Sequence, residues 1–199
     1  RRLYTYLAAR GVAHRKCGKL IVAVEPGEEA QIATLHQRAL DNGVEGMSAL
    51  TGAQARALEP NLHCVSALLS GETGIVDSHG YMLALRGEIE DNGGMLALNA
   101  PVLGGRVLSG GGFEVRIGGA APALVKCAVV VNAAGLHAQA VARSIDGMPT
   151  EHVPPLVLAK GSYFGCASKP AFERLIYPAP VEGGLGVHLT LDLAGRVRF

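Results

Sequence analysis

The sequence predicts an α/β fold with α+β character, and three observations support this prediction. Helical and strand patterns alternate along the 199 residues. The 27 glycines indicate many tight turns and close approaches of the backbone, as in mixed-sheet proteins. Residues 125–131 are almost continuously apolar, which is typical of a strand buried on both faces of a parallel sheet.

Helices and strands follow one another in the first half of the chain. Ile32, Leu35 and Leu40 recur at helical spacing, and Asn42-Gly43 supplies a stop signal after them. Thr51 or Gly52 can cap one of the later helices, and Asp77 or Ser78 can cap another. We expect helices over 3–10, 28–42, 51–58 and 78–92, strands over 19–24 and 65–69, and a short extended segment at 74–77.

The second half of the chain is mostly strand-like. Gly110-Gly111-Gly112 is expected to be the turn of a hairpin. Gly135 allows the chain to turn from the apolar strand into a helix over 138–145. We expect further strands over 95–98, 102–108, 113–117, 125–131, 156–164, 175–177, 185–191 and from 197 onward, with a boundary near 149–155.

The composition excludes some classes of protein. Hydrophobic residues make up 49% and charged residues 18%, so the chain is globular rather than disordered. There are 18 basic and 17 acidic residues, and the net charge is +1, so we expect no nucleic-acid partner. No run of 18 uninterrupted apolar residues predicts a membrane-spanning helix.

The four cysteines have no zinc-site or disulfide spacing. They are Cys17, Cys64, Cys127 and Cys166, and no Cys-x-x-Cys pair occurs among them. A reducing compartment, the cytoplasm, is therefore the expected location. The chain has no initiator Met, begins in a helical pattern and ends at Phe199 in a strand pattern, so we expect it to be a piece of a longer protein.

The end of the apolar strand is the first candidate for function. It runs into Asn132-Ala133-Ala134-Gly135, and the carboxyl ends of parallel strands face the crevice where ligands bind in doubly wound folds. Small residues let the backbone approach a cofactor closely, and the N-terminus of the following helix suits a pyrophosphate. The alternative is an ordinary strand-to-helix turn. No Gly-x-Gly-x-x-Gly fingerprint occurs, so any such motif would lie upstream of Arg1.

His188 is the second candidate for function. It lies among apolar strand residues next to Gly186, and a histidine can accept a proton near neutral pH. The alternative is a sheet histidine whose nitrogens are satisfied by a neighbour. The other histidines have no metal-ligand spacing, and we predict no metal site.

Four stretches together resemble a known family. They are Thr73-Gly74-Ile75-Val76-Asp77, Val130-Val131-Asn132-Ala133-Ala134-Gly135-Leu136, Lys160-Gly161-Ser162-Tyr163, and Leu175-Ile176-Tyr177-Pro178 with Leu185-Gly186-Val187-His188-Leu189-Thr190. In order and spacing they are similar to flavoproteins of the D-amino-acid oxidase and glycine oxidase type. Within that family they resemble L-2-hydroxyglutarate dehydrogenases and oxidases. Family members often have Arg-Gly-Glu or Arg-Gly-Asp where this chain has Lys160-Gly161-Ser162, which leaves the exact substrate open.

The resemblance implies a two-part fold. A doubly wound FAD-binding domain would be interleaved with a substrate domain built on a mixed, largely antiparallel sheet. Residues 1–98 would belong mainly to the substrate domain, residues 99–150 to the later strands and helix of the FAD domain, and residues 151–199 to further substrate-domain strands. The N-terminal fingerprint and the C-terminal glycine-rich segment of the family would lie outside this chain.

The resemblance also implies a site and a reaction. Val102, together with Ala133, Ala134 and Gly135, would contact FAD through the main chain. His188 would lie near the flavin as the catalytic base, with Tyr163 in the neighbourhood. The C2 hydrogen of an L-2-hydroxy acid would pass to the flavin as hydride, while His188 takes the hydroxyl proton. An arginine or a lysine should hold the substrate carboxylate.

Several functional expectations stay open at this point. The substrate is expected to be a small hydroxy acid resembling 2-hydroxyglutarate, and the electron acceptor oxygen or a quinone. Peripheral contact with the inner membrane is an alternative to a purely cytoplasmic location. An amino-acid or amine oxidase of the same fold, or a non-catalytic binding domain that kept the fold, are the alternative functions.

Overall fold

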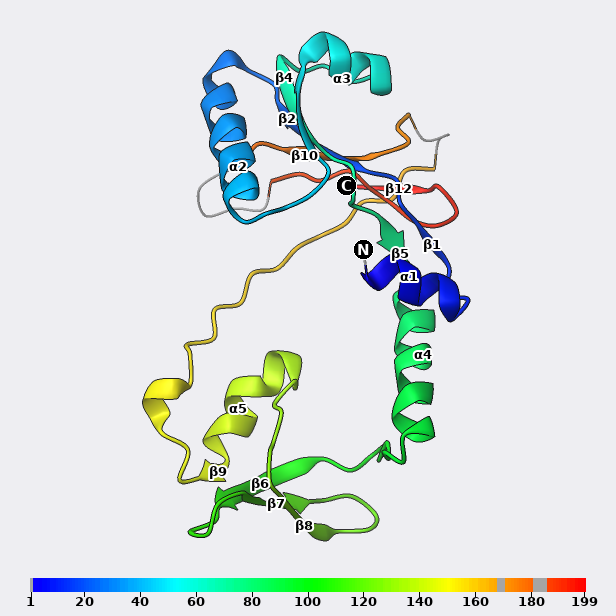
Figure 1. Cartoon of the computed structure of the whole chain (residues 1–199). Helices are drawn as coiled ribbons and strands as arrows, with labels where there is room; N and C mark the ends of the chain where they lie inside the picture. Colours follow the sequence, from blue (N-terminus) through cyan, green and yellow to red (C-terminus); the bar gives the residue numbers. More distant parts are fainter. Residues whose placement is uncertain (1, 168–170, 181–185) are drawn as a thin grey trace. The chain divides into compact units, whose positions relative to one another are not determined.

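The computed structural model describes residues 2–167, 171–180 and 186–199, which form two compact units (Figure 1). The first unit combines Arg1–Asp91 with Ser162–Phe199, and the second is Asn92–Gly161. Each unit is described below by itself. The division into FAD and substrate domains at 98/99 and 150/151 stays a prediction, because compactness alone does not say what each unit binds.

A mixed four-stranded sheet forms the centre of the first unit. Its strand order is β10 (Leu175–Pro178), β2 (Lys19–Ala23), β4 (Ser66–Ser70) and β3 (Met47–Thr51). β10 runs parallel to β2, and the other neighbours are antiparallel. The sheet is therefore mixed and largely antiparallel, and the predicted fold class is confirmed.

Helices cover both faces of this sheet (Figure 1). Side chains alternate between the two faces of a strand, so neighbouring residues of β2 enter different cores. Ile21 packs in the cluster that contains residues of α2 (Glu29–Asp41), and Val22 packs in the cluster that contains residues of α3 (Gly52–Leu58). Because it is buried on both faces, β2 is the most enclosed strand of the unit.

Side-chain caps mark the starts of two helices, α3 and α4 (Ser78–Asp91). Thr51 caps α3 in a reciprocal arrangement: the Gln54 amide donates to Thr51 Oγ1 at 3.2 Å, and the Thr51 amide donates to Gln54 Oε1 at 2.9 Å. Asp77 caps α4 (Ser78–Asp91), because its carboxylate accepts the His79 amide at 3.1 Å. The two pairs of alternative caps are thus resolved in favour of Thr51 and Asp77.

Short elements complete the first unit. α1 (Arg2–Ala9) precedes β1 (His14–Arg15), which pairs antiparallel with β5 (Ile75–Val76). β11 (Thr190–Leu191) and β12 (Val197–Arg198) form a second antiparallel pair. The predicted helices and the strands 19–24, 65–69 and 175–177 are confirmed within one or two residues. β3 was not predicted, because Met47–Thr51 has no clear alternation of apolar and polar residues.

The second unit has its own four-stranded sheet. The order is β8 (Ala123–Cys127), β7 (Phe113–Ile117), β6 (Val102–Val107) and β9 (Ile145–Asp146), and α5 (Ala138–Arg143) contacts β6 and β9. The predicted glycine hairpin is confirmed between β6 and β7, where the Leu108 amide donates to the Gly112 carbonyl at 3.0 Å. The described residues also include 3₁₀ turns at Pro26–Glu28, Gly135–His137 and Thr150–His152.

The prediction of a doubly buried parallel strand over 125–131 is wrong. β8 ends at Cys127, pairs antiparallel with β7 and is largely exposed, and Val131 keeps 84% of its surface accessible. The physical reason is the length of the partner strand. β7 begins at Phe113, which pairs with Cys127, so no residue of β7 remains to pair with the chain beyond that point.

Two other predicted strands are not found, and a third is shorter than predicted. Residues 95–98 and 156–164 form no strand, and 186–191 contributes only β11 and one bridge from Leu189 to Ile176, with residue 185 outside the described part. An apolar run becomes a strand only where a neighbouring backbone supplies hydrogen-bond partners. Near the 156–164 run, pairing starts only at its end, where Phe164 and Phe199 exchange backbone hydrogen bonds at 2.7 and 3.1 Å.

One buried carboxylate connects distant parts of the first unit. Glu59, which follows α3, is 2% exposed. Its oxygens accept the Glu173 amide at 3.2 Å, the Arg174 amide at 2.9 Å and Arg174 Nη1 at 3.1 Å. Arg174 Nη1 also donates to the Leu58 carbonyl at 3.1 Å. Glu59 therefore holds the entrance to β10 against the end of α3, across more than 100 residues of sequence.

Replacing Glu59 with Gln should destabilise the first unit strongly. The glutamine amide leaves the half-buried Arg174 guanidinium opposite a neutral group, and it replaces one acceptor with a donor that faces other donors. We therefore expect a loss of about 3 kcal/mol in the free energy of unfolding. Urea unfolding measures this loss. Glu90→Gln is the matched control, because Glu90 pairs with Arg86 in the open and should cost less than about 0.5 kcal/mol. Equal losses of unfolding free energy for the two variants would contradict the structural role of Glu59.

Candidate functional site

Lys19 and His188 both lie against the aromatic ring of Tyr177, at the edge of the first unit's sheet. Lys19 Nζ lies 4.9 Å from the centroid of the Tyr177 ring, and the His188 ring lies 4.1 Å from it at an interplanar angle of 37°. All three residues are half-buried. Within the described part of the chain, none of the three side chains forms a hydrogen bond or an ion pair with another protein group.

The sheet register places Lys19 next to Tyr177. β10 and β2 are parallel, with Leu175 opposite Lys19 and Tyr177 opposite Ile21. Lys19 and Tyr177 therefore lie on the same face of adjacent strands, two positions apart. Lys19 is the first residue of its strand, so its long side chain can leave the buried part of the sheet and reach the ring at the edge.

A second segment brings His188 to the same ring. The Ile176 amide donates to the Leu189 carbonyl at 3.1 Å, and the Leu189 amide donates to the Ile176 carbonyl at 2.9 Å, which attaches this segment to the free edge of β10. Gly186 makes the approach possible. It has φ +67, and a Cβ there would lie 2.6 Å from Pro178 Cγ. The glycine two residues before His188 is therefore required by the packing.

The chemistry of this cluster follows from its donors and acceptors. An ammonium and a phenol can donate hydrogen bonds to an anion, and a neutral imidazole can accept a proton. The Tyr177 ring face attracts the ammonium electrostatically, and the imidazole of His188 packs against the same ring. The cluster can bind a small anion and remove a proton from it.

Tyr163 is not part of this cluster. Its side chain is 71% exposed, next to Phe164, which pairs through its backbone with Phe199. Among the residues that the structure describes, no hydrogen bond or ring contact joins Tyr163 to His188. The proposed nearness of Tyr163 to the reacting centre stays a prediction.

The residues predicted to contact FAD lie in the second unit. Val102 begins β6 and is 42% exposed, and Ala133, Ala134 and Gly135 form an exposed turn. Asn132 shapes that turn. Its Nδ2 donates to the Ala138 carbonyl at 2.8 Å, and its Oδ1 accepts the Ala134 amide at 3.3 Å.

This turn fits a flat cofactor bound through the main chain. Gly135 has φ +56, and a Cβ built there would find no atom within 4 Å. Ala133 and Ala134 are exposed and carry only methyl side chains, which leaves little to screen the main chain of the turn. The residues present are therefore compatible with FAD, although the predicted buried strand before them is not found.

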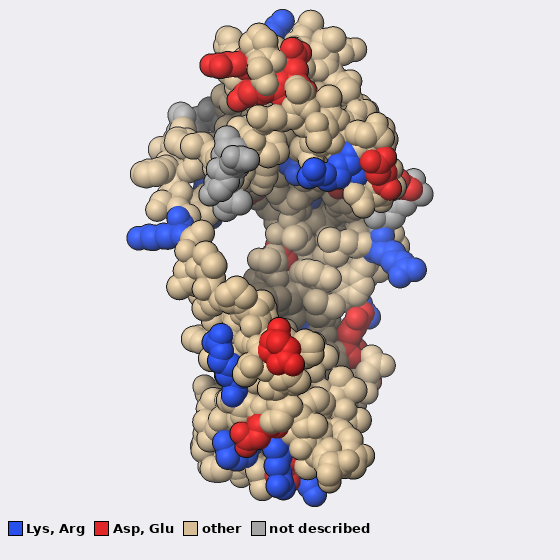
Figure 2. Space-filling model, turned by 90° about the vertical axis from the view of Figure 1, so that its left-hand side faces the viewer, with Lys and Arg blue, Asp and Glu red and all other residues tan. Residues whose placement is uncertain are grey.

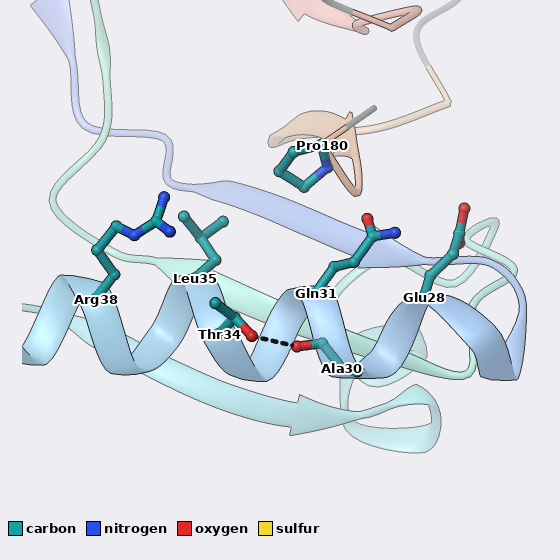
Figure 3. A pocket seen from close by; sticks show the side chains of 7 residues that line it. All are labelled: Glu28, Ala30, Gln31, Thr34, Leu35, Arg38 and Pro180. Atoms are coloured by element: carbon teal, nitrogen blue, oxygen red, sulfur yellow. Dashed lines mark hydrogen bonds between the residues drawn. The ribbon is translucent and has the colours of Figure 1, made fainter. Parts of the chain in front are cut away.

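Two hollows in the surface of the first unit are lined by residues other than Lys19, Tyr177 and His188. Figure 3 shows one along α2, where the Thr34 hydroxyl donates to the Ala30 carbonyl at 2.8 Å and Glu28 accepts backbone amides. Gln31 and Arg38 also line it, but no histidine or aromatic ring does. The other is an apolar hollow on the opposite side of the His188 segment, because Val187 and Leu189 alternate with His188. Its walls include Val22, Val24, Leu62, His63, Phe172, Ile176, Pro178 and Phe199.

Charges and possible metal ligands are dispersed. On the face in Figure 2, basic and acidic side chains are interspersed. In the described ranges, no three His, Cys, Asp or Glu side chains come together as metal ligands. None of the helices described there is both long enough and apolar enough to cross a bilayer.

Asp192 and Cys64, which lie outside the cluster, are among the side chains whose pKa values are shifted. The Arg196 amide and guanidinium donate to Asp192 at 2.9 and 2.7 Å, and these hydrogen bonds lower the pKa of the carboxyl. Burial raises the pKa of the Cys64 thiol. Asp192 shapes the turn between β11 and β12 and Cys64 lies in the core, so neither shift indicates a catalytic group.

The fold, the histidine cluster and the alanine-glycine turn together define a class of protein. The chain belongs to the family of FAD dependent oxidoreductases (DAO), which matches residues 1–199. The predicted family is thus confirmed, and so is the prediction of an enzyme.

Two curated relatives are similar to the chain along almost its whole length. The chain is 38% identical to the mitochondrial L-2-hydroxyglutarate dehydrogenase of Arabidopsis thaliana, over 99% of this chain and 47% of that protein. It is 28% identical to the Homo sapiens protein of the same name, over 98% of this chain and 44% of that protein. The chain spans about half the length of the curated relatives it matches.

Solved structures support the fold. The L-proline dehydrogenase of P. horikoshii matches with a TM-score of 0.75 at 16% identity, over 98% of this chain and 51% of that one. The L-alpha-glycerophosphate oxidase of Mycoplasma pneumoniae, solved with FAD bound, matches with a TM-score of 0.71 at 21% identity, over 94% of this chain and 49% of that one.

The sequence prediction named His188 but missed Lys19 and Tyr177. Both residues lie in strands that were predicted, and a signal was present in each. Lys19 is a cation at the start of an otherwise apolar strand, and Tyr177 is the aromatic residue of the short strand before His188. What could not be seen is the parallel pairing of β10 with β2, because the two strands are separated by more than 150 residues.

Proposed function

We propose that the protein oxidises an L-2-hydroxy acid of the 2-hydroxyglutarate type to the 2-oxo acid, with FAD as the cofactor. One observation carries the proposal: the half-buried His188 packs against the phenol ring of Tyr177, over which Lys19 also lies, and its imidazole nitrogens have no hydrogen-bond partner among the described residues. A histidine held only for stability would normally bond to a neighbour. The names of the relatives, L-2-hydroxyglutarate dehydrogenases, support the choice of substrate.

His188 acts as the base in this proposal. Its neutral imidazole takes the proton of the substrate C2 hydroxyl while the C2 hydrogen leaves with its electron pair, so that a carbonyl forms at C2. Tyr177 packs against the imidazole and fixes the plane of the ring. The imidazolium that results lies against the electron-rich ring face, which stabilises its charge.

The second unit supplies the cofactor contacts in this proposal. Val102, Ala133, Ala134 and Gly135 would hold FAD through their main chain, and FAD would supply the hydride acceptor. Oxygen or a quinone would be the final electron acceptor. The proposed location is the cytoplasm, with peripheral contact to the inner membrane as the alternative.

His188→Ala should remove turnover and keep the cofactor. The loss of a positioned base costs roughly 10²- to 10⁴-fold in kcat, while FAD, which the proposal places on the second unit, stays bound. Steady-state kinetics and the flavin absorbance measure the two effects. His36→Ala, on α2, is the control. A His188→Ala variant with near-parent kcat would show that another group is the base.

The protein should discriminate hydroxy acids from amino acids. We expect kcat/KM for L-2-hydroxyglutarate to exceed that for glycine and L-proline by roughly 10²-fold or more, because a cationic lysine in the site disfavours an ammonium substrate. Assays with oxygen and with a quinone acceptor test both electron acceptors. Preferential oxidation of an amino acid would favour the amine-oxidase alternative, and a protein that takes up no FAD would favour a non-catalytic domain.

Gly135→Ala should weaken FAD binding by roughly tenfold, about 1.4 kcal/mol, because its methyl group would lie between the backbone and the cofactor. The left-handed backbone also costs about 1 kcal/mol of stability for alanine. Gly43→Ala is a matched control, with φ +65 and equally open surroundings on the other unit. Both variants should lose similar stability in thermal unfolding, but only Gly135→Ala should raise the Kd for FAD. Equal Kd values would remove Gly135 from the cofactor site.

A further inference from the structure

We propose that Lys19 binds a carboxylate of the substrate through a charge-assisted hydrogen bond, and that Tyr177 positions the Lys19 ammonium for this contact. The proposal rests on the proposed hydroxy-acid oxidation and assigns the cation that such a substrate needs. It names a binding residue and a positioning residue in the first unit.

The charge of Lys19 is not neutralised within the described structure. Several other basic side chains of the unit have carboxylate partners, among them Lys16 with Glu72, Arg174 with Glu59, and Arg196 with Asp192. Lys19 is half-buried and has no ion pair or hydrogen bond of this kind. Withdrawing an ammonium from water without a counter-ion is unfavourable, so an anionic ligand would be strongly stabilised there.

The distances fit a 2-hydroxy acid. Lys19 Nζ is 4.9 Å from the centroid of the Tyr177 ring and the His188 ring is 4.1 Å from it, so ammonium and imidazole are no farther apart than the sum of these, 9.0 Å. A five-carbon chain spans about 5 Å between its terminal carbons, from ordinary bond lengths near 1.5 Å. A substrate carboxylate can therefore reach Lys19 while the C2 hydroxyl reaches His188.

Tyr177 contributes in two ways. Its ring face lies under the ammonium and limits the rotamers of a flexible side chain, which reduces the entropy lost on binding. Its hydroxyl has no protein partner among the described residues and can donate a second hydrogen bond to the same anion. The arginines Arg174 and Arg196 are less suited, because each already donates to a carboxylate.

The test uses the full-length, FAD-loaded protein and the variants Lys19→Gln, Lys19→Arg and Tyr177→Phe. Lys16→Gln is the matched control, because Lys16 also lies over a tyrosine ring, 5.7 Å from the Tyr4 centroid. Lys19→Gln should raise KM for L-2-hydroxyglutarate and the calorimetric Kd for 2-oxoglutarate by roughly 10- to 100-fold, with a much smaller change in kcat. Lys19→Arg should restore most of the lost affinity. Tyr177→Phe should keep the ring contact with Lys19 and should raise KM and Kd by a smaller factor than Lys19→Gln does.

The outcomes separate this proposal from the proposed function. A Lys19→Gln variant with the KM and Kd of the control would overturn the role of Lys19, even if the parent oxidises L-2-hydroxyglutarate. A parent that oxidises no hydroxy acid, but binds 2-oxoglutarate more tightly than Lys19→Gln does, would reject the proposed reaction and retain the carboxylate site. A parent that neither binds 2-oxoglutarate nor oxidises a hydroxy acid would overturn both. Unchanged FAD absorbance and melting temperature exclude misfolding.

Discussion

The position of β10 is the constraint on which the candidate site depends, and Glu59 is the group that enforces it. The buried carboxylate accepts the amides of Glu173 and Arg174 immediately before β10 begins. The next amide, that of Leu175, donates to the Gly18 carbonyl at 3.2 Å, so the strand enters beside β2 in one register. A shift of one residue would turn Tyr177 to the other face and away from Lys19.

The same strand organises the rest of the cluster. One edge of β10 pairs with β2, which carries Lys19, and the other edge accepts the segment that carries His188. β10 thus brings together residues from two distant parts of the chain. The close packing of Gly186 on Pro178 leaves no room for a side chain, which explains why the segment has a glycine two residues before the histidine. The same few residues therefore contribute both to the packing of the sheet edge and to the chemistry of the candidate site.

The two units show different relations between apolar sequence and burial. In the first unit the apolar strand β2 is covered by α2 on one face and α3 on the other, and its burial followed from its sequence. In the second unit the equally apolar residues 125–131 are largely exposed. Hydrophobicity predicts that a segment will be buried only if another layer of the fold is available to cover it. No helix or strand of the second unit covers this run.

The sequence by itself determined most helices, because periodicity and capping residues are local signals. Its short glycine-containing stretches also carried the resemblance to the family and pointed to the histidine of the candidate site. Thr51, Asp77 and the glycine hairpin are examples in which a few adjacent residues were sufficient. Only the tertiary structure decided which strands pair, and therefore which side chains meet. Lys19 and Tyr177 become neighbours through a parallel pairing across more than 150 residues, and such long-range contacts leave no periodic trace in a single sequence.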